Sequence, residues 1–175
     1  MLNWILYLTH QWRNPMRKLI SCLLGAVCII SSSLLTQTVH ADDDPVLKAI
    51  KARQAGFQLY SFYAGHLFAM AKGEMEYDAE LASTMAQNLN TVANLSNGAM
   101  WPQGSDNEAY AGKTRALPEI WTTYPAIGEK SQALKDATAA MVEVAGNGLD
   151  ALRSKIGAVG QSCKGCHDDF RAEDF

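Results

Sequence analysis

The stretch LDALRSKIGAVGQSCKGCHDDF, residues 149–170, decides the fold prediction, because its spacing and its chemistry point the same way. Its apolar or bulky positions recur at alternating intervals of three and four residues: Leu149, Leu152, Ile156, Val159, Cys163, Cys166 and Phe170. This period places the side chains on one face of an α-helix. We therefore predict a helix over residues 149–170 whose inner face carries both cysteines.

Three segments further upstream show the same alternation, so the sequence predicts four helices in all. The first covers residues 46–71 and follows Asp44, a good N-cap residue. The second covers residues 81–95, and a weaker third covers 127–145. No stretch alternates with a period of two, so we expect no sheet. Short links favour antiparallel neighbours, and a long connection joins the second helix to the third. The prediction is an all-α, antiparallel four-helix bundle.

Length and charge exclude several classes of protein. The chain has 175 residues, a formal net charge of −3 and four cysteines, which suits one domain with a core of its own. A nucleic-acid-binding protein would show a clustered basic surplus, and none is present. We therefore expect no nucleic-acid partner.

The first 41 residues have the pattern of a secretory signal peptide. Met16-Arg17-Lys18 is a short basic region, residues 19–30 are largely apolar, and Val39-His40-Ala41 offers a cleavage site. The alternative is a membrane anchor, but the apolar run is shorter than the roughly 20 residues needed to span a bilayer. Met16 is a candidate for the true start. We expect cleavage after Ala41, no membrane attachment afterwards, and a periplasmic domain over residues 42–175.

The chemistry is concentrated in Cys163-Lys164-Gly165-Cys166-His167, the attachment signature of c-type haem. On a helix these two thiols and the imidazole share a face, so both thiols reach haem vinyl groups while His167 reaches the iron. A structural zinc site usually has four Cys/His ligands, and outside this motif residues 42–175 contain no cysteine and one histidine, His66, so zinc is the less favoured alternative. A thioredoxin-like pair belongs at the start of a helix, and a disulfide across two residues closes almost nothing. We predict one covalently bound haem c near the C-terminus.

Three segments resemble the cytochromes c′, the class II c-type cytochromes. They are Arg53-Gln54-Ala55-Gly56-Phe57, Pro118-Glu119-Ile120-Trp121, and the run from Ser162 to Arg171 that contains the haem motif. The resemblance implies a four-helix bundle with haem near the C-terminus. It also implies a homodimer formed through the first two helices.

The resemblance also assigns the second axial position of the iron to the residue four after Arg53, which is Phe57. Phenylalanine has no lone pair to donate, so the resemblance implies a five-coordinate, high-spin iron with an apolar distal pocket. Spacing alone allows Phe57 to be an ordinary core aromatic. A methionine ligand from another helix, Met85 or Met141, is the less favoured alternative, because methionine is common core filler.

The remaining candidates have two interpretations each. Arg53 either pairs with a haem propionate, as the resemblance favours, or extends along the bundle edge into solvent. Arg171 either lies beside the proximal histidine or is a solvated cation near the chain end. His66 is interpreted as a surface or packing residue. Trp101 and Trp121 are expected in or beside the haem crevice.

Two functions follow. The first is a haem protein that binds NO and CO through an open iron site. The second is a six-coordinate, low-spin electron-transfer cytochrome with a redox partner protein. Phe57 favours the first, and no distal acid or base is visible for an enzyme such as a peroxidase.

Overall fold

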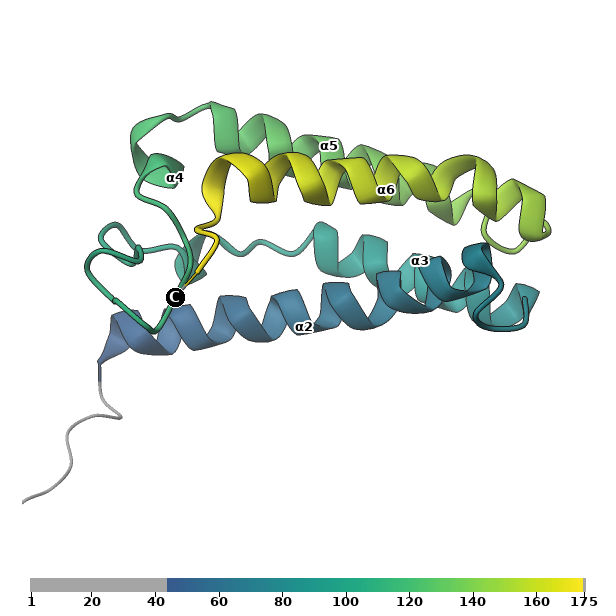
Figure 1. Ribbon diagram of the computed structural model, residues 1–175, viewed down its shortest axis with the longest axis horizontal. Coiled ribbons are helices and arrows are strands. Elements are labelled where there is room, and N and C mark those ends of the chain that lie inside the picture. Colours follow the sequence, from purple (N-terminus) through teal and green to yellow (C-terminus); the bar gives the residue numbers. More distant parts are fainter. Residues whose placement is uncertain (1–43, 175) are drawn as a thin grey trace, which may run out of the picture. The chain divides into compact units, whose positions relative to one another are not determined.

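The computed structural model describes residues 44–174, which form one compact unit. The signal-peptide prediction for residues 1–41, with its possible start at Met16, lies outside these residues. Four long helices make up the described part: α2 (Pro45–Lys72), α3 (Ala79–Ala93), α5 (Ala126–Val142) and α6 (Leu149–Phe170) (Figure 1). The all-α prediction is confirmed, and the only β-type pairing in residues 44–174 is an isolated bridge between Ala116 and Arg171.

Helix α2 begins and ends where its sequence dictates. Asp44 accepts hydrogen bonds from the amides of Val46 (2.8 Å) and Leu47 (3.3 Å), and a proline occupies the first turn. Gly73 closes the helix at φ +79°, a left-handed conformation that glycine adopts without steric cost. These two caps fix the length of the helix that carries Arg53 and Phe57.

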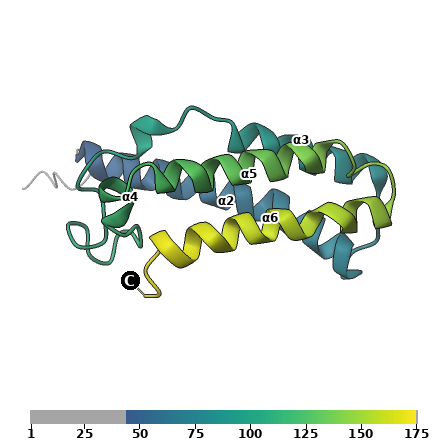
Figure 2. The same cartoon turned by 90° about the horizontal axis from the view of Figure 1, so that it is seen from above.

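The four helices form two antiparallel hairpins, α2 with α3 and α5 with α6 (Figures 1 and 2). Helix α3 also contacts α5, and α6 also contacts α2, so each helix has two neighbours around a common core. Thirteen buried side chains form this core; the largest fully buried ones among them are Leu67, Met70, Leu89, Met141, Leu152 and Val159. Burial of such side chains stabilises the bundle by about 1.5–3 kcal/mol each.

Two helices end earlier than predicted. Helix α3 stops at Ala93, and Leu95 is 50% exposed rather than part of the core. The Asn94 side chain donates to the carbonyl of Asn90 (2.9 Å), and such local bonds compete with continuation of a helix. Helix α5 stops at Val142 rather than Ala145, although Ala145 stays buried in the turn that follows.

The long connection between α3 and α5 lies at the end of the bundle where α6 finishes (Figure 1). It contains a 3₁₀ turn, η3 (Gly98–Met100), and a one-turn helix, α4 (Glu119–Thr122). Within residues 44–174, no helix combines the length and the apolar character needed to cross a membrane.

Candidate functional site

The last turns of α6 bring the predicted attachment residues together. Cys163, Cys166 and His167 are all half-buried, whereas Lys164 on the other face is exposed. Burial raises the pKa of both thiols. Burial also lowers the pKa of His167, and the nearby charges of Arg171 and Arg115 lower it further. The imidazole is therefore neutral near pH 7 and keeps a nitrogen lone pair.

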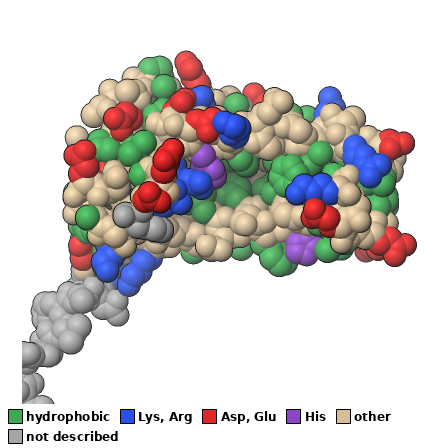
Figure 3. Space-filling model, viewed as in Figure 1, with side chains coloured by type: hydrophobic (Ala, Val, Ile, Leu, Met, Phe, Trp, Pro, Cys, Tyr) green, Lys and Arg blue, Asp and Glu red, His purple; other side chains and the backbone are tan. Residues whose placement is uncertain are grey.

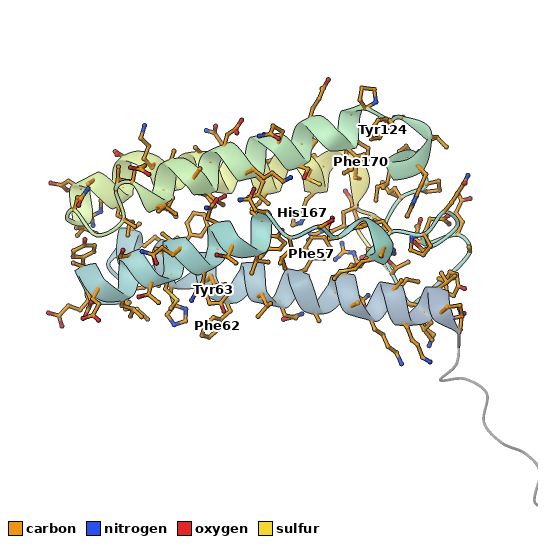
Figure 4. All side chains as sticks on the ribbon, turned by 180° about the vertical axis from the view of Figure 1, so that it is seen from behind. Phe57, Phe62, Tyr63, Tyr124, His167 and Phe170 are labelled. Carbon is orange, nitrogen blue, oxygen red and sulfur yellow. The ribbon has the colours of Figure 1, made fainter. Side chains whose placement is uncertain are left out.

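Helix α2 supplies the wall opposite these residues. Tyr60 lies near Cys163: burial raises the pKa of Tyr60, and the charge that Cys163 carries when ionised raises it further. The Tyr60 hydroxyl donates to the carbonyl of Val92 at 3.1 Å, which fixes the position of its ring. Phe57 lies one turn before Tyr60, at the same level along the bundle as His167 (Figure 4). The site is thus bounded by thiols and an imidazole on α6 and by aromatic rings on α2.

The space between these two helices suits a flat apolar cofactor. Figure 3 shows a hollow floored by hydrophobic side chains, with a histidine at its edge. Phe57 is 44% exposed, so the interpretation as an ordinary buried core aromatic is wrong. Just before the attachment residues, a Cβ on Gly160 would lie 3.3 Å from the Phe68 ring, so a larger residue there would require the ring to move by a few tenths of an ångström. Two thiols and one neutral imidazole are the groups that attach a c-type haem and bind its iron, and the aromatic wall suits the flat face of such a cofactor.

Trp101, from the long connection, completes the wall beside Phe57. Its ring meets the Phe57 ring edge-on, with the centroids 6.2 Å apart. The Trp101 carbonyl accepts a hydrogen bond from the Trp121 indole nitrogen at 3.1 Å, and the two indoles lie 6.2 Å apart. Both tryptophans therefore belong to this end of the bundle, and Trp101 borders the expected distal face directly.

Arg53 is 4% exposed, so the interpretation as a side chain that extends into solvent is wrong. Its terminal nitrogens donate to the hydroxyl of Ser105 (2.6 Å), the Ser105 carbonyl, the hydroxyl of Thr114 (2.9 Å) and the Met100 carbonyl (3.3 Å). Its guanidinium also lies 4.6 Å above the Trp101 ring. Burial lowers the pKa of Arg53. The pairing of Arg53 with a propionate stays a prediction, but its structural partners all belong to the long connection.

A cavity of about 370 Å³ lies beside His167. Its lining consists of Arg115, His167, Asp168, Arg171, Ala172 and Glu173. Arg171 is therefore near the histidine, as the helical spacing predicts. Arg115 is a residue that the sequence did not point to, because it lies in the long connection, far along the chain from the haem motif.

The other sequence candidates lie away from this site. Met85 and Met141 are 8% and 0% exposed and belong to the central core cluster. The His66 ring packs against the Phe62 ring in a tilted arrangement with the centroids 4.6 Å apart, and its Nδ1 lies 2.8 Å from the Phe62 carbonyl. Phe62 points away from the other helices (Figure 4), so His66 is a packing histidine on the outer side of α2.

Comparisons with known proteins agree with this geometry. Residues 48–171 match the family model described as cytochrome C′. The chain is 37% identical over 127 residues to a cytochrome c′ of Halomonas halodenitrificans, which covers 71% of this chain and 96% of the relative. A solved cytochrome c′ from Rhodobacter sphaeroides superposes with a TM-score of 0.72 at 35% identity, over 74% of this chain and 99% of that one.

A further match bears on ligands. A ferrous variant of cytochrome c′ from Alcaligenes xylosoxidans with bound NO matches with a TM-score of 0.62 at 32% identity, covering 72% of this chain and 94% of that one. A CO-bound variant of the same protein has the same TM-score, at 33% identity and over 71% and 94% of the two chains.

Proposed function

This chain belongs to the cytochrome c′ family, with its covalently bound haem c, and we propose that it is an exported, periplasmic haem protein whose five-coordinate, high-spin iron binds NO and CO. The haem supplies an iron centre that binds small molecules at its open position. In this proposal Cys163 and Cys166 form the two thioether bonds, and His167 is the axial ligand. The protein is then a gas-binding haem protein rather than an enzyme.

The observation that carries the proposal is Phe57 on the α2 wall. It stands at the level of His167, it is 44% exposed, and its side chain has no atom that donates electrons to iron. Both methionines considered as alternative ligands are packed in the core. A sixth ligand from the protein is therefore not expected at the distal face.

The chain's own residues also define which ligands are favoured. Phe57 and Trp101 present ring edges and faces to the distal side, and rings exclude water. Neither the Phe57 ring nor the Tyr60 hydroxyl, which already donates to Val92, offers a hydrogen bond to a bound molecule. A polar or anionic ligand loses its hydration there without compensation, whereas neutral NO and CO lose little.

Substituting methionine for Phe57 tests this proposal. A Met side chain four residues after Arg53 provides a thioether that can reach the iron, so Phe57→Met should become low-spin and lose most of its CO binding. Phe62→Met is the matched control, because Phe62 lies on the same helix, is 55% exposed and points outward. CO titration of both ferrous variants measures the effect. If Phe57→Met bound CO as the wild type does, Phe57 would not be the distal residue.

We also propose that the protein is a homodimer through α2 and α3, as the family resemblance implies. Leu59 and Phe62, three residues apart on α2, are 43% and 55% exposed. Two large apolar side chains on one outer helix face are typical of a surface that another protein chain covers.

A further inference from the structure

Arg115 fastens the long connection to the end of the chain. Its Nε donates to the carbonyl of Ala172 at 2.7 Å, and its Nη2 donates to the carbonyl of Glu173. The Ala172 amide donates back to the Arg115 carbonyl at 2.8 Å. Ala116 forms the isolated β-bridge with Arg171, and the Leu117 amide donates to the Phe170 carbonyl at 3.1 Å. We call this set of contacts, residues 115–117 with 170–173, the tail junction.

The tail junction shares a cavity with His167, the expected axial ligand. Helix α6 ends at Phe170, and the Arg171 amide makes its last helical hydrogen bond, to the His167 carbonyl at 3.3 Å; the Ala172 amide donates to the long connection instead. Chain ends without such anchors are usually poorly ordered. Here Arg115, Ala172 and Glu173 line the cavity that also contains His167 and Arg171. The junction therefore forms the wall on the side of His167.

The loop side of the junction is itself anchored. Thr114, the neighbour of Arg115, accepts a hydrogen bond from the buried Arg53, and the Gln54 side chain donates to the carbonyl of Lys113 at 2.7 Å. Residues 113–115 are thus held by α2 on one side and hold the chain end on the other. The backbone that carries Arg115 is therefore held in place by hydrogen bonds, as a positioning residue requires.

We propose that Arg115 is a positioning residue for His167: its guanidinium fork holds residues 171–173 over the adjacent cavity and thereby fixes the orientation of the imidazole toward the haem iron. The proposal rests on the proposed role of His167 as axial ligand. The planar guanidinium donates to two carbonyls at once, which lysine, a point charge on a flexible stem, does not reproduce. The two hydrogen bonds of the guanidinium, rather than its positive charge alone, therefore hold the chain end in place.

The test compares Arg115→Met and Arg115→Lys with a matched control, Arg153→Met. Arg153 makes an equivalent contact, Nε to the carbonyl of Ala71 at 2.7 Å, away from the haem motif. Two quantities are measured on the intact ferrous holoprotein: the iron–histidine stretching band in resonance Raman spectra, and hydrogen exchange of the Ala172 amide.

We expect Arg115→Met to shift or broaden the iron–histidine band and to speed Ala172 exchange by about tenfold, the effect of losing roughly one good hydrogen bond. Arg115→Lys should show an intermediate change in both, and Arg153→Met should change neither. An iron–histidine band identical to wild type in Arg115→Met, despite faster exchange, would make the junction merely structural and overturn the proposal. If Arg115→Met does not fold, a wild-type band in Arg115→Lys overturns it. A wild-type ferrous protein that is already six-coordinate would instead contradict the proposed function, independently of the variants.

Discussion

Two residues one turn apart on α2 reverse the usual relation between polarity and burial. Arg53 is 4% exposed, whereas Phe57 is 44% exposed. A buried charge needs partners, and Ser105, Thr114 and Met100 supply them to Arg53. A large exposed aromatic needs a cover, and haem provides one in the proposed site. The buried Arg53 thus holds the long connection, and the exposed Phe57 contacts the haem in the proposed site.

Removal of the Arg53 side chain should be strongly destabilising. Arg53→Met leaves buried acceptors on Ser105 and Thr114 without a donor, and we expect the free energy of unfolding to fall by about 3 kcal/mol. Gln54→Ala, which removes an exposed bond to the same loop, should cost no more than about 1 kcal/mol. Denaturant unfolding of both variants measures the difference. Equal losses would show that Arg53 does not anchor the loop.

At the scale of elements, the helices were predictable and the loop contacts were not. Local signals mark α2 and α6: Asp44 before the first, and a regular apolar period along the second. Periodicity also placed Cys163, Cys166 and His167 together on one face. The partners of Arg53 and the role of Arg115 depend on a long connection that folds back onto α2 and the chain end. No local pattern encodes such contacts, so Arg115 could be found only in the structure.

The start of α6 provides a prediction of its own. Gly148 has φ +113° and ψ 157°, a conformation that is essentially restricted to glycine. Gly148→Ala should therefore lower the free energy of unfolding by about 1–3 kcal/mol. Gly157 lies inside α6 with nothing within 4 Å of an added Cβ, so Gly157→Ala should raise it by about 0.5–1 kcal/mol. In thermal unfolding, the melting temperature should fall for Gly148→Ala and rise for Gly157→Ala. A change in the same direction for both variants would contradict this account of the helix.

For residues 44–174 as a whole, the functional groups gather at one end of the bundle while an outer face of α2 stays apolar. The α6 terminus, the long connection and the Arg53 turn of α2 converge at that end (Figure 1). Leu59 and Phe62 lie on the outer face instead. The proposed ligand site and the proposed dimer interface therefore lie on separate sides of α2.

This separation makes the dimer testable without disturbing the haem. Phe62→Glu places a charge on the outer face and should weaken the dimer by about 30-fold or more, the effect of losing a central contact of about 2 kcal/mol. Tyr124→Glu is the control, because Tyr124 is 78% exposed in the long connection. Sedimentation velocity over a concentration series distinguishes the two. A Phe62→Glu dimer as stable as wild type would place the interface elsewhere.

The central claim is an iron with one protein ligand, His167, and an open distal face bordered by Phe57. The optical spectrum of the purified ferrous protein, recorded with and without CO, tests it most directly. We predict a high-spin spectrum that CO converts to a six-coordinate form. A low-spin spectrum with a methionine–iron charge-transfer band in the ferric state, and no change on adding CO to the ferrous protein, would contradict it.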